Sequence, residues 1–348
     1  MLSANNKTAM ASNKSSRTHQ ALALLLFFLL TLSSAHAKDG IAMYWGQKNG
    51  DGTLTSICDT GNFEIVNLAS LSTFGCGRTP EWNFAGHCRP WSRCKKLAPE
   101  IKHCQRNGVK VFLSLGGADG FYSLCSPEDA KSVSDYLYNN FLSGRKGPFG
   151  SVYLDGIDLD IEGGSNLYWD DLARGLDTRR KQDRYFYLSA APECSFTDHY
   201  LDTAIRTWLF DYIFVQFYNN PPCQYSNGDA SRLLSSWNTW TSYVKRNNTV
   251  FMGLPAGPDA APSGGYISPQ DLCTKVLPTI KHTPNYGGVM LWDRYRDITN
   301  HYGDQIKDCV EVDDSVRGSQ TLMATLSNTV YECVSAAFNR IVPKLRPF

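Results

Sequence analysis

The chain has 348 residues, with 34 Lys and Arg side chains against 33 Asp and Glu, and its formal net charge is +1. That balance excludes the strong basic field on which nucleic-acid binding depends. A hydrophobic content of 42% and a charged content of 19% exclude an intrinsically disordered chain. The length fits either two domains or one α/β barrel.

Residues 1–37 have the composition of a secretion signal. Three basic residues precede the apolar run 21–34, and residues 35–37 form an A-x-A cleavage site. A signal anchor is the alternative, but the run is shorter than the roughly 20 residues that cross a bilayer. We therefore expect a secreted protein with no membrane segment after signal removal.

Eight short apolar runs, rich in β-branched and aromatic residues, recur along the rest of the chain. Helix-like stretches such as 127–142 and 230–245 lie between several of them. Buried strands that alternate with helices are typical of a parallel sheet. Eight such units predict one closed (β/α)8 barrel, a TIM barrel, over residues 38–313, and an open doubly wound sheet is the alternative. The runs are 41–44, 63–71, 109–115, 152–161, 185–190, 212–217, 250–254 and 288–291.

The tail at 314–348 differs from the barrel units. Its apolar residues fall on one helical stripe, which fits either a surface helix packed on the barrel or a removable sorting peptide. A sorting peptide would direct the protein to the vacuole instead of the extracellular space. The stripe consists of Leu322, Leu326, Val330, Val334, Phe338 and Ile341.

All 11 cysteines follow the signal, and an oxidising compartment makes disulfides the first interpretation. No C-x-x-C pair and no Cys/His cluster has the spacing of metal ligands, so no metal is predicted. No G-x-G-x-x-G follows the first apolar run, so a dinucleotide cofactor has no support, and we expect no cofactor. Asn247 begins the one N-x-T sequon after the signal, a candidate glycosylation site.

The most informative stretch is 155–162, DGIDLDIE. Side chains on a strand alternate between faces, so Asp158, Asp160 and Glu162 share one face and the apolar residues between them share the other. In a barrel strand the apolar set meets the helices. The carboxylates then point inward, with Glu162 nearest the C-terminal mouth, where barrel enzymes carry out their chemistry.

Three carboxylates about 6–7 Å apart repel one another, so we expect one of them to share a proton. This is how a carboxylic acid stays protonated near neutral pH, and we interpret Glu162 as a general acid. A solvated acidic edge strand and a cation site with three oxygen ligands are the alternatives. Asp155 has the opposite parity and is interpreted as structural.

The carboxylate run resembles the D-x-x-D-x-D-x-E signature of glycoside hydrolase family 18. Residues 114–117, SLGG, are similar to that family's motif at the third strand, and 212–220 are similar to its sixth-strand motif. Within the family, the chain resembles the plant class III chitinases, and the resemblance covers about 39–310. The segments that carry it are YWGQ at 44–47, AGHC at 85–88, LYWDDLAR at 167–174, NNPPCQY at 219–225 and GGVMLW at 287–292.

This resemblance implies endo-type hydrolysis of β-1,4-linked N-acetylglucosamine in chitin, with retention and without an enzyme nucleophile. Glu162 would protonate the glycosidic oxygen while the substrate's acetamide oxygen attacks the anomeric carbon. Asp160 would accept the acetamide N–H and stabilise the oxazolinium cation, and Asp158 would share a proton with Asp160. Tyr218 would donate its hydroxyl to the acetamide oxygen. The partner is then chitin or a chito-oligosaccharide, and we expect a monomer.

The same resemblance implies that Tyr44, Gln216, Trp292 and Gly117 bind substrate. Trp292 would form an apolar floor under the distorted sugar. Gln216 is two residues from Tyr218 and therefore shares its face of the sixth strand. The alternative for each of these aromatic and amide side chains is an ordinary core position.

Two positions depart from the family pattern. Ser70 stands where an aromatic residue usually follows the alanine of the second strand, and Ala118-Asp119 replaces Gly and an apolar residue after the third. These changes put catalytic efficiency in doubt. A weak or inactive chitinase-like lectin, glycosidase inhibitor or storage protein is therefore the alternative function. The retained Asp158, Asp160 and Glu162 favour an enzyme.

The resemblance also implies three disulfides, and the remaining cysteines allow two more. The family pattern maps to Cys58–Cys104, Cys88–Cys94 and Cys194–Cys223. Cys76 and Cys125 follow neighbouring strands at the mouth, and we expect them to pair. Cys273–Cys309 is a further candidate pair, which leaves Cys333 over in the tail.

Overall fold

The computed structural model describes residues 39–88, 94–245 and 248–312. The predicted signal, the tail with Cys333 and the sequon residue Asn247 lie outside the described residues, and those predictions stay predictions. Within the described ranges no helix is long and apolar enough to cross a membrane.

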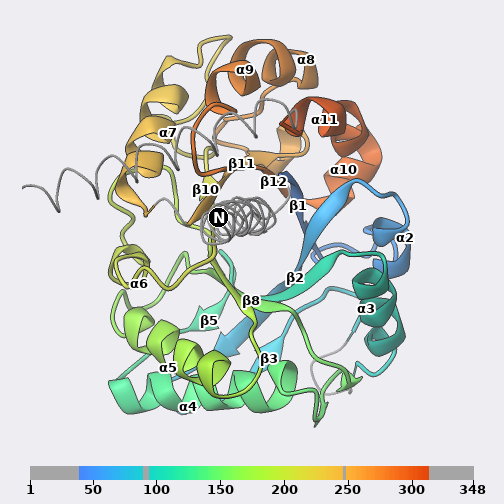
Figure 1. Ribbon diagram of the computed structural model, residues 1–348, viewed down its shortest axis with the longest axis vertical. Helices are drawn as coiled ribbons and strands as arrows, with labels where there is room; N and C mark the ends of the chain where they lie inside the picture. The colour runs from blue at the N-terminus through green and yellow to red at the C-terminus, as the bar shows by residue number, and fades with distance from the viewer. Residues whose placement is uncertain (1–38, 89–93, 246–247, 313–348) are drawn as a thin grey trace, which may run out of the picture. The chain divides into compact units, whose positions relative to one another are not determined.

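Eight parallel strands close into one barrel, which confirms the predicted fold (Figure 1). The order around the ring is β1-β12-β11-β10-β9-β8-β4-β2, and pairing of β2 with β1 completes it. Every strand contains one of the predicted apolar runs or lies within it to a few residues. The strands are β1 (Gly40–Trp45), β2 (Phe63–Phe74), β4 (Lys110–Gly116), β8 (Gly156–Asp160), β9 (Tyr187–Ala190), β10 (Tyr212–Gln216), β11 (Thr249–Pro255) and β12 (Tyr286–Trp292).

Helices cover the outside of this ring (Figure 1). The α-helices are α2 (Leu54–Cys58), α3 (Leu97–Arg106), α4 (Pro127–Leu137), α5 (Trp169–Gln182), α6 (Asp202–Ile205), α7 (Ser231–Tyr243), α8 (Pro269–Asp271), α9 (Leu277–Ile280), α10 (Arg294–Asn300) and α11 (Tyr302–Val310). Single π or 3-10 turns are η1 (Tyr138–Leu142), η2 (Pro258–Ala260) and η3 (Leu272–Val276). In the part of the chain that the structure describes, four two-residue strands lie outside the ring: β3 (Glu81–Trp82), β5 (Phe121–Tyr122), β6 (Lys146–Gly147) and β7 (Gly150–Ser151).

The fourth barrel strand is shorter than the predicted run 152–161. The N–H of Leu154 donates to the carbonyl oxygen of Phe141 at 2.7 Å, so this part of the run packs on the turn after α4 instead of the sheet. At the other end β8 stops at Asp160. Glu162 therefore lies two residues beyond the strand, in the loop at the mouth, and not on the strand itself.

Aromatic side chains fill the inside of the barrel below the carboxylates. The rings of Phe112 and Tyr212 have centroids 6.0 Å apart, and those of Phe214 and Phe251 lie at 5.2 Å. Gly156 shares the inward face of β8, where a Cβ would come within 2.8 Å of the Phe112 ring. The glycine thus makes room for the aromatic rings that pack below the carboxylates.

Closure of the barrel between β1 and β12 depends on Gly288. This residue pairs with Gly40 at a φ of +123°, and a Cβ there would overlap the Gly40 carbonyl oxygen. We expect Gly288→Ala to lower the free energy of unfolding by about 3 kcal/mol or more, because the backbone must shift to relieve the overlap. Urea unfolding measures this directly.

Gly61→Ala is the matched control. Gly61 also has a positive φ, +68°, but nothing lies within 4 Å of a Cβ there. Only the strain of a left-handed residue remains, about 1 kcal/mol. Equal losses in the two variants would contradict the role assigned to the β1–β12 contact.

Within the described ranges five disulfides join ten cysteines, and the pairs are those expected above. All Cα–Cα distances fall within the range that a disulfide spans. Cys194–Cys223 ties the loops after β9 and β10, and Cys76–Cys125 ties the loops after β2 and β5. The distances are 5.2 Å for Cys58–Cys104, 5.2 Å for Cys76–Cys125, 5.7 Å for Cys88–Cys94, 5.8 Å for Cys194–Cys223 and 5.6 Å for Cys273–Cys309.

Candidate active site

Three carboxyl groups come together at the C-terminal end of β8. Asp158 is fully buried and Asp160 is 5% exposed, whereas Glu162 is half-buried in the loop above them. Ile157 and Leu159 belong to the hydrophobic layer between strands and helices. The alternation read from the sequence is therefore present in the strand: the acidic face points into the barrel.

Asp158 is held by three hydroxyl donors from three other strands. Tyr44 Oη donates to Asp158 Oδ2 at 2.7 Å, Ser114 Oγ donates to the same oxygen at 2.8 Å, and Ser189 Oγ donates to Oδ1 at 2.6 Å. Burial raises the pKa of Asp158 above its usual value, and these hydrogen bonds oppose that rise. The side chain is thus fixed on both oxygens.

Asp160 is the carboxyl with the stronger bias toward its protonated form. Burial raises its pKa well above the usual value, and the nearby charges of Glu162 and Asp158 raise it further. The closeness of the Glu162 carboxyl group contributes to this rise. Among the described residues the hydrogen bonds to Asp158 come from hydroxyl groups, and the sharing of a proton between Asp158 and Asp160 stays a prediction.

Gln216 links the two upper carboxyl groups. Its Nε2 donates to Asp160 Oδ1 at 3.0 Å, to Glu162 Oε1 at 3.1 Å and to the carbonyl oxygen of Ala191 at 2.9 Å. The Ala191 contact anchors the amide to the end of β9. The nitrogen consequently faces the two carboxyl groups and fixes their separation.

Aromatic side chains border the carboxyl groups. Tyr218, 6% exposed, follows β10, and its pKa is raised by burial and by the charges of Asp160 and Glu162. Among the described residues none hydrogen-bonds to its hydroxyl, which leaves that donor for a ligand. Tyr44 lies with its ring centroid 5.5 Å from that of Trp292, which is half-buried at the end of β12.

The two departures from the family pattern lie on the β2–β4 side. Ser70 is buried, and its Oγ donates to the carbonyl oxygen of Gly116 at 2.8 Å. Gly117 has a φ of +88°, and its N–H donates to the carbonyl oxygen of Asp160 at 2.7 Å. Ser70 therefore acts as a polar tie between strands, while Asp119 is exposed on the rim.

Three residues of the site carried no assigned role in the sequence. Ser114 and Ser189 lie directly opposite Asp158 in the registers of β4 and β9 with β8. Ser114 belongs to the SLGG motif, so the sequence pointed to its segment, whereas no motif in the sequence pointed to Ser189. Tyr122 reaches the backbone of Glu162 from β5, a strand too short to predict.

The raised pKa of Asp160 predicts a stability gain when its charge is removed. We expect Asp160→Asn to raise the free energy of unfolding by about 1 kcal/mol at pH 7, because the amide keeps an acceptor for Gln216 and carries no charge to bury. A carboxyl whose pKa rises on folding stabilises the fold fully below its unfolded pKa of about 3.9, and this contribution disappears as the pH rises through the folded pKa.

The advantage of Asp160→Asn should therefore shrink as the pH falls from 7 to 4, which urea unfolding at the two pH values measures. Asp119→Asn, on the exposed rim, is the control and should change little at either pH. A difference in the free energy of unfolding between Asp160→Asn and the wild type that grew on acidification would contradict the raised pKa of Asp160.

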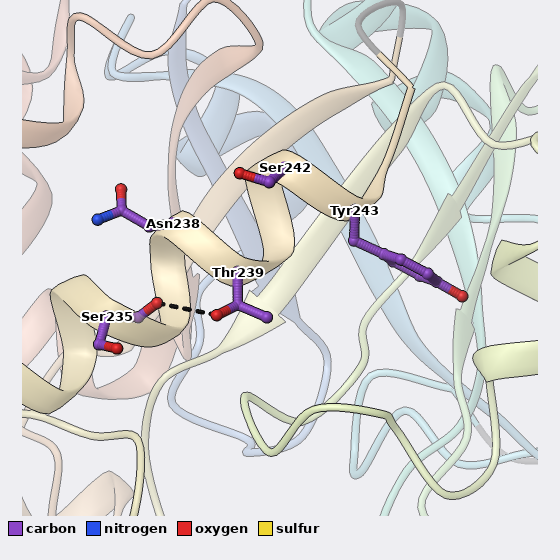
Figure 2. A pocket seen from close by; sticks show the side chains of 5 residues that line it. All are labelled: Ser235, Asn238, Thr239, Ser242 and Tyr243. Carbon is purple, nitrogen blue, oxygen red and sulfur yellow. Dashed lines mark hydrogen bonds between the residues drawn. The ribbon is translucent and has the colours of Figure 1, made fainter.

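A shallow hollow on the outer face of α7 has no part in this site. Figure 2 shows its polar lining, in which Thr239 Oγ1 donates to the carbonyl oxygen of Ser235 at 3.1 Å within the helix. The other lining residues are Asn238, Ser242 and Tyr243. None of the residues named at the barrel mouth lines it.

A parallel barrel with a general-acid candidate, a carboxyl pair and aromatic walls at its C-terminal mouth has the architecture of a barrel hydrolase. Residues 40–263 match the sequence model of the glycosyl hydrolases family 18. The chain belongs to that family.

Relatives of known structure or activity agree with this membership. An acidic endochitinase of Vitis vinifera is 50% identical over 84% of this chain and 99% of its own length. A crystal structure of a chitinase from Ipomoea carnea, 50% identical, covers 78% of this chain and all of its own, with a TM-score of 0.74. A xylanase and α-amylase inhibitor protein from Scadoxus multiflorus is 42% identical, with coverage of 77% and 97% and a TM-score of 0.73.

Proposed function

We propose that this protein is a secreted or vacuolar endo-acting chitinase that hydrolyses β-1,4 links between N-acetylglucosamine units with retention. The observation that carries the proposal is the pair of carboxyl groups, Asp160 and Glu162, that Gln216 Nε2 bridges above the buried Asp158. The similarity to acidic endochitinases over most of the chain supports the same substrate.

In the first step Glu162 gives its proton to the glycosidic oxygen as the bond to the anomeric carbon breaks. Its half-buried place in the mouth loop gives it access to a bound polymer. The acetamide oxygen of the substrate attacks the same carbon from the other face, and an oxazolinium cation forms. No carboxylate of the protein needs to reach that carbon.

Asp160 supports the cation through the acetamide N–H. When Glu162 loses its proton, the Asp160 carboxylate can accept the N–H of the substrate acetamide, and Asp160 lies at the end of β8, two residues before Glu162. Tyr218 would donate its hydroxyl to the acetamide oxygen and so hold the nucleophile in place. Both contacts become strongest when charge develops, as catalysis requires.

In the second step the Glu162 carboxylate takes a proton from water. The water attacks the anomeric carbon, the oxazolinium ring opens and the product regains its acetamide. Two displacements at one carbon restore the β configuration. Tyr44 and Trp292, which stand together at the mouth, would pack against the sugar ring during both steps.

The second candidate is a binding protein without turnover. It is favoured by the likeness to the Scadoxus multiflorus inhibitor protein and by Ser70 and Asp119, which depart from the family pattern beside the site. Ser70 provides a hydroxyl in place of an aromatic ring, so apolar contact with a sugar is reduced.

Incubation with N-acetylglucosamine hexamer, followed by mass spectrometry of the products, separates the two functions. A chitinase of the endo type releases dimers, trimers and tetramers within the first turnovers. Binding in calorimetry without any product would instead establish the lectin or inhibitor function and overturn the proposal.

A further inference from the structure

Tyr122 lies beside the site but outside the motifs that define it. It belongs to β5, which pairs with β2 at Thr73 and Phe74. Successive side chains on a strand point to opposite faces, and accordingly Phe121 is 67% exposed whereas Tyr122 is 4% exposed. The buried ring is directed toward the loop that carries Glu162.

The Tyr122 hydroxyl joins two backbone groups of the mouth. It accepts the N–H of Glu162 at 2.9 Å and donates to the carbonyl oxygen of Gly117 at 3.0 Å. Gly117 in turn donates its N–H to the carbonyl oxygen of Asp160. One hydroxyl therefore connects the loop after β4 to the loop after β8, at the residue where the β8 ladder has already ended.

Packing around the Tyr122 ring fixes the position of its hydroxyl group. The ring stacks on Phe74 with centroids 5.4 Å apart and planes 6° from parallel, and its edge meets Trp169 at 6.3 Å. Two glycines leave space for the ring: a Cβ at Gly120 would overlap it, and a Cβ at Gly116 would lie 3.1 Å from Tyr122 Cζ. These contacts on the face and the edge of the ring restrict its rotation.

The segment that carries Tyr122 is itself fastened to the end of β2. The Cys76–Cys125 disulfide closes it, with a Cα–Cα distance of 5.2 Å. Asp129 Oδ2 accepts the N–H of Cys76 at 2.7 Å and the N–H of Cys125 at 3.0 Å. The disulfide and the carboxylate hold the same two residues, and they anchor the segment that carries Tyr122.

We propose that Tyr122 is a positioning residue for the hydrolysis, and this inference rests on the proposed function. Its hydroxyl replaces the missing strand pairing at Glu162 and so holds the backbone from which the general acid reaches the glycosidic oxygen. A general acid displaced by a fraction of an ångström transfers its proton less efficiently, although the sugar still binds. The Cys76–Cys125 disulfide and Asp129 support Tyr122 by anchoring the segment that carries it.

The test compares Tyr122→Phe with the wild type on N-acetylglucosamine hexamer. The variant keeps the ring and loses only the hydroxyl. We expect kcat to fall about tenfold, with KM and the calorimetric Kd unchanged within about twofold, because the lost hydrogen bonds act on proton transfer and not on sugar contacts.

Tyr286→Phe is the matched control. Tyr286 is also buried, and its hydroxyl donates to the carbonyl oxygen of Val310 at 2.9 Å, at the start of β12 and so at the opposite end of the barrel. The Tyr286→Phe variant loses an equivalent hydrogen bond, and its kcat should stay within about twofold of the wild-type value. Thermal unfolding of both variants shows whether their losses of stability match.

A second variant, Cys76→Ser with Cys125→Ser, loosens the segment and keeps the hydroxyl. We expect kcat to fall about threefold at unchanged KM. An active wild type together with an unimpaired Tyr122→Phe, or equal losses in Tyr122→Phe and Tyr286→Phe, would overturn this inference alone. A wild type that binds the hexamer without cutting it would overturn the proposed function and this inference with it.

Discussion

Replacement of Glu162 by Gln should lower kcat on chitin oligosaccharides by about 10²–10⁴-fold, because the amide has no proton to give to the leaving oxygen. The fold should be unaffected, since the amide oxygen still accepts from Gln216 Nε2, which lies 3.1 Å from Glu162 Oε1. Binding of the oligosaccharide, measured by calorimetry, should stay close to that of the wild type.

Glu128→Gln is the control for this experiment. This substitution makes the same change of side chain at an exposed position in the first turn of α4, outside the barrel. Its kcat should equal that of the wild type. A Glu162→Gln variant with more than a tenth of wild-type activity would show that another group protonates the leaving oxygen.

Removal of the acetyl groups from the substrate should have an effect of similar or larger size. If the acetamide oxygen is the nucleophile, a fully deacetylated hexamer has none, and its initial rate should be lower by at least about 10³-fold at equal concentration. The glycosidic oxygen that Glu162 protonates is present in both substrates. The loss therefore reports on the nucleophile and not on the acid.

The measurement compares initial rates of product release from the acetylated and deacetylated hexamers. Competition by the deacetylated hexamer against cleavage of the acetylated one is the control, because it shows whether the poor substrate still enters the site. Comparable rates for the two hexamers would mean that a side chain of the protein attacks the anomeric carbon.

The inward face of β8 could be predicted because strand geometry is local. The alternation of Ile157 and Leu159 with Asp158 and Asp160 is complete within five residues, and it holds in the structure. The position of Glu162 could not be predicted in the same way. Its N–H bonds to Tyr122, 40 positions away in the chain, and no pattern within the segment carries that information.

The hydrogen-bond partners of Asp158 could not be predicted from the sequence for a related reason. Ser114, Asp158 and Ser189 form one row across β4, β8 and β9, and the row depends on the registers of two parallel pairings. A register is a relation between strands, and each strand separately appears only as an apolar run. The role predicted for Asp160 through Asp158 stays a prediction, because the orientation of a carboxyl group depends on the donors around it.

The central claim is hydrolysis with the substrate's own acetamide as nucleophile, and the configuration of the first product tests it most directly. Proton NMR of the hexamer digest, recorded before mutarotation, resolves the anomeric proton of the new reducing end. We expect the β-anomer, because the oxazolinium forms and opens by two displacements at one carbon. An initial α-anomer would contradict the mechanism, and with it the roles given to Asp160 and Tyr218.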